Sequence, residues 1–508
     1  GTSAFEKRGI AVDVPVWDAT KCIQCNQCSY VCPHAAIRPV AMTEAEAANA
    51  PEGMQMKDMT QMPGYKFAIV VSAYDCTGCG SCVNVCPDKV QAITMQNFEA
   101  NADEQKYFDY AVTLDDKQEV IDKFKLVSVK GSQFKQPLLE FSGACAGCGE
   151  TPYAKLITQL FGDRMYIANA TTGCSSIWGN SSPSTPYTVN KKGQGPAWSN
   201  SLFEDAAEFG YGMLLAQRAI RDRLKAELDV LAETANDDVK AAIAEWNETF
   251  NSGVTNGAAT DKLVAALEAC GCEKANAILK EKDYLAKKSQ WVFGGDGWAY
   301  DIGFGGVDHI LASGKDINVM VFDTEVYSNT GGQSSKSTPV GAIAQFAAGG
   351  KETKKKDLAG IAMSYGYVYV AHISMGADMN QTVKALAEAE AYPGPSLIIA
   401  YAPCINHGIK KGMSKAQTEE KLAVEAGYWH NFRFNPELKA AGKNAFSLDS
   451  KAPTGDYQEF LKGENRYASL AKFNPERAAE LFAQSEANAK ERYEHLKKLV
   501  TLYAGEEQ

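Results

Sequence analysis

The sequence predicts an α/β domain with a parallel sheet and a helical insertion, preceded by a small, cysteine-rich α+β domain. Two observations lead to this prediction. Cysteines recur with one spacing in the first 118 residues, and from about residue 119 apolar strand-like runs alternate with helical stretches. Such alternation is typical of a parallel sheet that is covered on both faces. We therefore predict one domain over 1–118 and a second over 119–508.

The composition is that of a globular protein with an excess of acidic residues. The 508 residues include 51 Lys and Arg against 62 Asp and Glu, which gives a net charge of -11. This balance argues against nucleic acid as a partner. The chain lacks an apolar run of about eighteen residues, which argues against a membrane span. Because Gly1 is not preceded by Met or followed by a signal-like segment, we expect a cytoplasmic location and a longer parent polypeptide.

The spacing Cys-x2-Cys-x2-Cys-x3-Cys-Pro occurs twice in the first domain, which indicates metal binding in a reducing compartment. Three closely spaced thiolates ligate one [4Fe-4S] cluster, whereas the fourth cysteine of the run ligates the neighbouring cluster. Zinc sites are the alternative, but zinc modules rarely space three cysteines so closely. We therefore predict a dicluster ferredoxin-like domain, with one cluster on Cys22, Cys25, Cys28 and Cys86 and another on Cys76, Cys79, Cys82 and Cys32.

A polar, Met-rich segment over 41–64 separates the two runs, and we expect it to be an irregular surface excursion. Its methionines are expected to pack rather than to bind copper. The following residues, 66–74, are predicted to form a strand that leads into the second cysteine run.

The second domain is predicted to contain a parallel sheet interrupted by helices. A helical insertion is expected over 202–288, with helices at 218–234 and 261–269, and an amphipathic helical tail is expected over 475–503. The predicted strands are 165–171, 290–293, 318–323, 367–373 and 396–402.

An acidic loop follows the second of these strands. The apolar run ends in Gly294, Gly295, Asp296 and Gly297, and a carboxylate in such a flexible loop suits Mg²⁺. The next strand ends in a second polar loop, where Thr324 offers a hydroxyl and Val326 a carbonyl oxygen. Carboxyl ends of neighbouring parallel strands share one edge of the sheet. The two loops therefore predict a site for a diphosphate and its metal ion, although a lone Gly-Asp-Gly is also common in ordinary turns.

Six further cysteines lie in the second domain. Cys145 and Cys148 share one loop, and Cys174 and Cys404 follow predicted strands at the same sheet edge as Asp296. We predict that these four cysteines hold a third [4Fe-4S] cluster. Cys270 and Cys272 end a helix of the insertion, and we expect them to be ordinary thiols rather than a metal site.

This combination resembles the carboxyl-terminal half of pyruvate:ferredoxin oxidoreductase, also called pyruvate synthase. Most thiamine enzymes place Asn where this chain has Thr324, and Thr takes that role in this family. The stretches that carry the resemblance are GACAGCGETPY (143–153), TTGCSSIWG (171–179), GPAWSNSLFEDAAEFGYGM (195–213), GGDGWAYDIGFGGVDH (294–309) and TEVYSNTGGQSSKSTP (324–339).

The resemblance implies a thiamine diphosphate-binding domain in which Asp296, Thr324 and the carbonyl of Val326 hold Mg²⁺. Asn329 is implied to lie near the substrate as a catalytic residue. The residues implied to surround the cofactor are Glu150, Cys174, Gly295, Asp296, Gly297, Trp298, Thr324, Glu325, Val326, Tyr327, Ser328 and Asn329.

The resemblance also implies the reaction and its partners. Pyruvate is decarboxylated oxidatively to acetyl-CoA and CO₂, and electrons pass through three [4Fe-4S] clusters to ferredoxin or flavodoxin. The implied enzyme is a homodimer whose substrate-anchoring residues, activating Glu and coenzyme A domain lie in an amino-terminal half, in cis or in trans. A related enzyme for another 2-oxoacid and a purely electron-relaying subunit are the alternatives. A solvated face is expected for Lys351, Lys354, Lys355 and Lys356, with docking of an acidic ferredoxin as the alternative.

Overall fold

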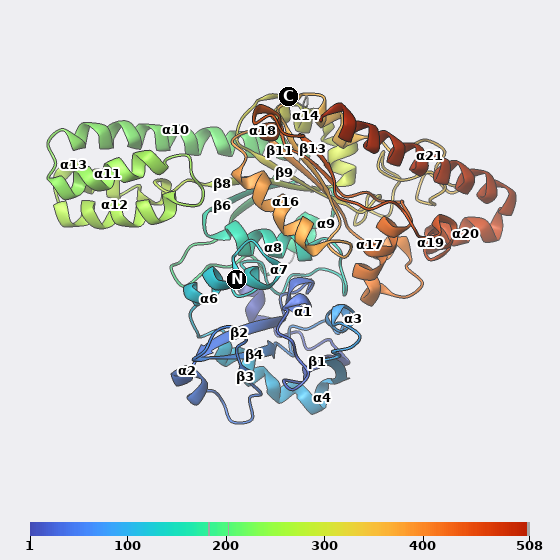
Figure 1. Ribbon diagram of the computed structural model, residues 1–508, viewed down its shortest axis with the longest axis horizontal. Coiled ribbons are helices and arrows are strands. Elements are labelled where there is room, and N and C mark those ends of the chain that lie inside the picture. The colour runs from blue at the N-terminus through green and yellow to red at the C-terminus, as the bar shows by residue number, and fades with distance from the viewer. Residues whose placement is uncertain (181–182, 202, 505–508) are drawn as a thin grey trace.

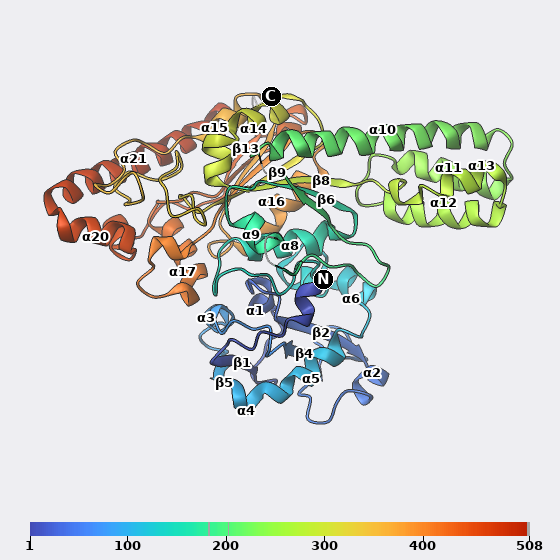
Figure 2. The same cartoon turned by 180° about the vertical axis from the view of Figure 1, so that it is seen from behind.

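A computed structural model describes residues 1–180, 183–201 and 203–504. Figure 1 shows a cysteine-rich domain at the bottom, a central sheet domain above it, and two helical extensions on opposite sides. One extension contains α10 to α13, and the other contains α20 and α21. Figure 2 shows the same arrangement from behind.

The cysteine-rich domain contains two antiparallel sheets and two short helices that each carry a cysteine of the repeated spacing. Strand β1 (Asp13–Trp17) pairs with β5 (Ile93–Asn97), and β4 (Tyr65–Val71) lies between β2 (Ile37–Thr43) and β3 (Lys57–Asp58). Helix α1 (Gln27–Tyr30) carries Cys28, and α3 (Ser81–Val85) carries Cys82. The β1–β5 pair brings the start of the first cysteine run close to the end of the second, because Trp17 lies opposite Ile93.

The prediction of an irregular excursion over 41–64 is wrong in its first part. Strand β2 continues to Thr43, and helix α2 (Glu44–Ala48) follows directly. Thr43 accepts from the backbone of Glu46, whose side chain accepts from the backbone of Thr43, so the helix begins with a capping box. The Thr-x-x-Glu sequence was the signal for this helix. The methionines pack as predicted, since Met54 and Met59 are buried and Met56 and Met62 contact the same core.

The second domain is built on one mixed sheet. In the described part of the chain its strands have the order β13-β12-β10-β11-β9-β8-β6-β7, of which only β12 and β13 are antiparallel to their neighbours. All five predicted strands are present. The three additional strands lie toward the sheet edges and have only three or four residues, so they lack a readable apolar pattern. The bounds are β6 (Met165–Asn169), β7 (Ala197–Asn200), β8 (Ser289–Gly295), β9 (Asn318–Asp323), β10 (Tyr369–Ile373), β11 (Ser396–Tyr401), β12 (Phe432–Phe434) and β13 (Phe446–Leu448).

Helices cover both faces of this sheet, as the alternating pattern predicts. On β9, Val319 and Val321 pack into one apolar core, and Met320 and Phe322 pack into the other. The first core includes α10 (Ala206–Ala232), α14 (Phe304–Ala312), α15 (Leu358–Met363) and α21 (Pro475–Leu502). The second includes α8 (Thr151–Phe161) and α16 (Met379–Ala391). The fold class predicted from the sequence is therefore confirmed.

Helix α10 belongs to both the sheet domain and the projecting arm. Its first half packs on the sheet through Ala206, Ala207 and Leu214, and its second half forms a separate core with the helices that follow. Arg221 lies at this transition, where its guanidinium donates to the carbonyls of Leu285 (2.9 Å) and Phe250 (2.7 Å). The arm visible in Figure 1 is thus the distal part of the predicted insertion.

The remaining helices complete the chain, and the described residues contain no helix long and apolar enough to cross a membrane. Helix α21 confirms the predicted amphipathic tail, because Leu481, Phe482 and Leu496 are buried in the sheet-domain core. The other bounds are α4 (Phe98–Asn101), α5 (Gln105–Ala111), α6 (Gln118–Phe124), α7 (Val129–Ser132), α9 (Cys174–Asn180), α11 (Asp237–Thr249), α12 (Asn256–Cys270), α13 (Glu273–Leu279), α17 (Ala416–Glu425), α18 (Pro436–Ala440), α19 (Tyr457–Lys462) and α20 (Asn465–Phe473).

Candidate active site

The candidate site lies where the carboxyl ends of four neighbouring strands meet. Strands β11, β9, β8 and β6 are adjacent in the sheet and parallel. They lead into Cys404, Thr324, Asp296 and Cys174, respectively. The sheet topology therefore brings these four residues to one edge, as the sequence predicts.

Asp296 is fully buried and is surrounded by oxygen donors. The backbone N–H and the hydroxyl of Thr324 both donate to Oδ1 of Asp296, at 3.2 and 3.0 Å. The Thr324 hydroxyl also lies 3.0 Å from the carbonyl oxygen of Val326. Adjacent ligands of an octahedral Mg²⁺ ion are about 2.9 Å apart, given Mg–O distances of about 2.1 Å. The Thr324 hydroxyl therefore lies as far from the Asp296 oxygen and from the Val326 oxygen as neighbouring Mg²⁺ ligands would lie from each other.

Ser335 is a further contact of this carboxylate, and the sequence reasoning did not single it out. Its hydroxyl donates to Oδ2 of Asp296 at 2.6 Å. The residue lies within the family-like stretch 324–339, which was the available signal. Burial, followed by the nearby carboxylate of Asp323, raises the pKa of Asp296 well above its usual value. A divalent cation would offset this unfavourable charge.

Two glycines allow the loops of the site to approach each other closely. Gly173 has φ 113°, and a Cβ placed on it would lie 3.2 Å from the backbone nitrogen of Gly295. A Cβ on Gly297 would lie 2.5 Å from the ring of Tyr327. Trp298 follows in a π-helical turn, Gly297–Ile302, and its indole is buried in the core beneath α10 and α14. Its side chain therefore packs the turn that presents Asp296.

The side chains of the loop after β9 differ in their surroundings. Ser328 lies 3.0 Å from the Cys174 sulfur through its hydroxyl, whereas Asn329 is exposed. Glu325 is buried and adopts a left-handed backbone conformation with φ 60°. It forms ion pairs with Lys355 (2.9 Å) and Arg466 (2.8 Å). Burial alone would raise the pKa of Glu325, but these two cations lower it to about 2.

This ionic cluster corrects the expectation that residues 351–356 form a solvated face. Lys355 is largely buried and also pairs with Asp323 at 2.9 Å, while Lys351 donates to the carbonyl of Ser335 at 3.0 Å. Lys354 does lie at the surface, paired with Glu491. The lysines in the sequence did not reveal that this segment packs against the loop after β9.

The turn after β11, which contains Cys404, contacts the loop after β9. His407 is buried, and its Nε2 lies 2.6 Å from the carbonyl oxygen of Thr324. The Asn406 amide donates to the carbonyl of Ser328 at 3.0 Å. Neither residue was singled out from the sequence, because their contacts depend on the adjacency of β11 and β9. The third predicted cluster and the predicted metal site therefore share one structural unit.

Glu150 immediately precedes α8 and lies near the cysteines at the sheet edge. It is buried, and the indole N–H of Trp178 donates to Oε2 at 2.7 Å. Burial raises the pKa of Glu150 to about 7, although the bond from Trp178 opposes this shift. Its charge acts on Cys148 and Cys174.

The cysteines fall into the three groups predicted from the sequence. One cavity is lined by Cys22, Cys25, Cys28 and Cys86, and another is lined by Cys32, Cys76, Cys79 and Cys82. In the sheet domain, Cys148, Cys174 and Cys404 interact electrostatically with one another, and Cys404 interacts with Cys145. No three His, Cys, Asp or Glu side chains in the described residues are close enough to share a single ion. Separated thiolates around a cavity are instead what a cubane needs, because each binds a different iron.

Cys270 and Cys272 lie on the projecting arm, outside these groups. Their sulfurs are 3.0 Å apart.

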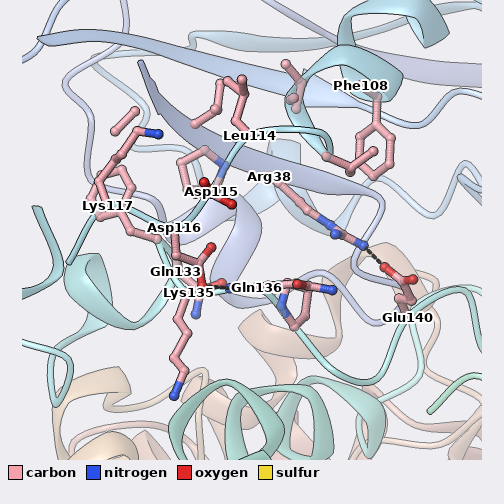
Figure 3. A pocket seen from close by; sticks show the side chains of 18 of the residues that line it. Arg38, Phe108, Leu114, Asp115, Asp116, Lys117, Gln133, Lys135, Gln136 and Glu140 are labelled. Carbon is pink, nitrogen blue, oxygen red and sulfur yellow. Dashed lines mark hydrogen bonds and ion pairs between the residues drawn. The ribbon is translucent and has the colours of Figure 1, made fainter. Parts of the chain in front are cut away.

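A further cavity, of about 200 Å³, opens between the cysteine-rich domain and the segment that leads to the sheet (Figure 3). Its wall includes Asp116, Lys135, and the ion pair between Arg38 and Glu140, but no residue of the strand-edge site.

Comparison with known families finds a separate match in the cysteine-rich part of the chain and in the sheet domain. Residues 21–90 match the family described as "4Fe-4S dicluster domain", and residues 269–400 match "Thiamine pyrophosphate enzyme, C-terminal TPP binding domain". The fold and the site thus define an iron-sulfur protein with a thiamine diphosphate-binding domain.

Longer curated relatives match nearly the whole of this chain. The chain is 58% identical to pyruvate-flavodoxin oxidoreductase of Enterobacter agglomerans over 99% of its own length and 43% of that protein. It is 58% identical to pyruvate:ferredoxin oxidoreductase of Moorella thermoacetica over 98% of its own length and 43% of that protein. Pyruvate dehydrogenase [NADP(+)], mitochondrial, of Euglena gracilis is 48% identical over 98% of this chain and 28% of that protein. The resemblance to pyruvate:ferredoxin oxidoreductase is therefore confirmed, for a chain that spans about two fifths of these bacterial relatives.

Proposed function

We propose that this chain supplies the thiamine diphosphate site and the electron path of an enzyme that oxidatively decarboxylates pyruvate. Coenzyme A would accept the acetyl group, and ferredoxin or flavodoxin would accept the electrons. The observation that carries the proposal is the convergence of Asp296, Thr324 and Val326 at the strand edge that also holds Cys174 and Cys404. The activities for which the relatives are named support pyruvate as the substrate.

Within this proposal, Asp296, Thr324 and the Val326 carbonyl hold Mg²⁺, and the backbone of Gly295–Trp298 lies against the diphosphate. The bond from Ser335 fixes the orientation of the Asp296 carboxylate. When bound, thiamine diphosphate supplies the ring that accepts the electron pair released on decarboxylation. Ser328 and Asn329, on the loop after β9, would lie toward the reacting end of the cofactor.

The contacts between the domains support an order for the three predicted clusters. The ring of His34 lies 3.3 Å from the carbonyl oxygen of Cys145, and the backbone of Gly147 hydrogen-bonds to Cys79. The group of Cys32, Cys76, Cys79 and Cys82 is thus adjacent to the strand-edge group. Its member Cys82 interacts electrostatically with Cys28, which belongs to the remaining group. Ile23, which follows Cys22 of that group, is 56% exposed. Electrons would therefore leave the protein from the cluster on Cys22, Cys25, Cys28 and Cys86.

The proposal is tested by cofactor analysis of the purified chain after anaerobic reconstitution. Three cubanes require about twelve irons and twelve sulfides per chain. Exchange of Cys404 for Ser should remove about four irons, whereas the matched Cys270→Ser exchange should remove none. Thiamine diphosphate should bind only with a divalent ion present. An iron count near eight, or absence of thiamine binding, would favour the alternative of an electron-relaying subunit.

Substrate and carrier are tested in an assembled enzyme that includes the amino-terminal portion found in the relatives. Pyruvate should reduce ferredoxin or flavodoxin in a coenzyme A-dependent reaction. Faster turnover with another 2-oxoacid would replace pyruvate as the substrate. The homodimer, the amino-terminal half in cis or in trans, and the cytoplasmic location stay predictions from the resemblance and the sequence.

A further inference from the structure

Lys155 is a buried cation that has no carboxylate partner among the described residues. It lies on α8, five residues after Glu150, and is only 1% exposed. Its ammonium donates to the carbonyl oxygen of Ser29 and to Oε1 of Gln133, the latter at 3.2 Å. Lys355, which is largely buried, instead pairs with two carboxylates. A buried charge is costly unless an opposite charge compensates for it, so Lys155 requires another source of negative charge.

The position of Lys155 identifies that source. Ser29 lies in the segment between Cys28 and Cys32, which the proposed assignment gives to two different clusters. This segment is wedged into the sheet domain, because Tyr30 and Val31 pack in its core and the Tyr30 hydroxyl donates to the Met379 carbonyl at 3.0 Å. The ammonium of Lys155 is therefore held beneath residues 28–32, one of the two stretches of chain that serve both clusters of the cysteine-rich domain in the proposed assignment.

Polar contacts hold the ammonium in this position. The Ser29 hydroxyl donates to Oε1 of Gln133 at 3.0 Å, and the Gln133 amide donates to Gln159 at 3.0 Å. Gln133 also lines the cavity of Figure 3, whereas Lys155 does not. Burial lowers the pKa of Lys155 to about 8, and Cys32 and Cys28 oppose this shift, so the side chain stays mostly protonated at neutral pH.

We propose that Lys155 is a shared counter-ion that raises the reduction potentials of both clusters in the cysteine-rich domain. Each cluster gains one negative charge on reduction, and a fixed cation in a low-dielectric interior stabilises the more negative state. Lys155 would thereby favour electron transfer away from the strand-edge site. The inference rests on the proposed electron path, because it presupposes clusters on these eight cysteines.

Lys155 belongs to the sheet domain, although it acts on the cysteine-rich domain. Helix α8 starts just after Cys148, so one helix runs from the strand-edge group to the segment of Cys28 and Cys32. The potentials of the two clusters would therefore depend on the docking of the two domains. Lys155 would act through its charge on the reduction potentials of the clusters, and not as a catalytic residue.

The test is a redox titration of the reconstituted full chain, followed by electron paramagnetic resonance. Lys155→Met removes both the charge and the donors, and Lys155→Gln removes the charge but keeps a donor for Ser29 or Gln133. In both variants the ratio of reduced to oxidised cluster at a fixed potential should fall at least tenfold, which is 59 mV for one electron. The matched control is Lys130→Met, since Lys130 lies near Cys25 and Cys22 but is half-buried at the surface. Its effect should stay below threefold because solvent screens the charge.

Three outcomes can be told apart. A Lys155→Gln variant with parental midpoints and full iron content would overturn the proposal, because only the hydrogen bonds would then matter. Loss of the two clusters from both neutral variants would also overturn it, by showing a structural role. A parental chain that lacks clusters on these cysteines would instead refute the proposed electron path itself.

Discussion

Exchange of Asp296 for Asn should separate the stability of the fold from the binding of the cofactor. Asn keeps the shape of the side chain and an oxygen that accepts the bonds of Thr324, and its amide can donate to Ser335. It removes the only carboxylate among the three oxygens that converge at the predicted Mg²⁺ site. Unit charges about 4 Å apart interact by about 4 kcal/mol at an effective dielectric constant of about 20. We therefore expect Mg²⁺-dependent thiamine diphosphate binding to weaken at least a hundredfold, or about 2.7 kcal/mol.

In the absence of cofactor, the Asp296→Asn exchange should make the protein more stable at neutral pH. Burial raises the pKa of Asp296 in the folded state, so the folded chain binds this proton more tightly than the unfolded chain does. The stability of the cofactor-free parent should therefore fall as the pH rises above the unfolded pKa of about 3.9. Asn cannot ionise, so the variant should lack this contribution and be the more stable protein at neutral pH.

Calorimetric titration with thiamine diphosphate and Mg²⁺ measures the first effect, and thermal unfolding between pH 5 and pH 8 without cofactor measures the second. Asp301→Asn is the matched control, because Asp301 lies on the same turn but contacts Lys336. Parental cofactor affinity in Asp296→Asn would refute the metal assignment. A variant that is less stable than the parent at every pH would refute the electrostatic reasoning.

Three further exchanges address other parts of the chain. Arg466→Met leaves Glu325 and Glu464 with fewer partners and should cost about 3–5 kcal/mol in unfolding free energy, whereas Lys354→Met breaks an exposed pair and should cost under about 1 kcal/mol. A similar cost for both would contradict the buried network. Arg221→Met should increase hydrogen exchange in α11 to α13 because the Leu285 and Phe250 carbonyls lose their donor, and the exposed Arg223→Met serves as the control. In an assembled enzyme, Cys148→Ser should abolish ferredoxin reduction by pyruvate while dithionite still reduces the clusters of the cysteine-rich domain; thiamine content is measured alongside, and ferredoxin reduction at the parental rate would exclude a single path.

Features that depend on short stretches of sequence were predictable. The eight cysteines of the first domain occupy contiguous loops, so their spacing alone indicates cubane ligation and even the exchange of the fourth cysteine between runs. The five buried strands were also predictable, because each is a continuous apolar run between turn signals. The strands β7, β12 and β13 were missed, since strands of three or four residues are too short to show an apolar pattern of their own.

The sequence by itself predicted the types of ligand: thiolates for iron, and one carboxylate, one hydroxyl and one carbonyl for a hard cation. Only the tertiary structure decided how residues far apart in the chain meet. The order β11-β9-β8-β6 brings His407 to Thr324, and the loop after β9 brings Ser335 to Asp296. The tertiary structure also brings the Glu325 carboxylate to Lys355 and Arg466. The docking of α8 buries Lys155 beneath the first cysteine run. Such contacts depend on strand order and helix docking, which arise from burial summed over whole faces and leave no local pattern in the chain.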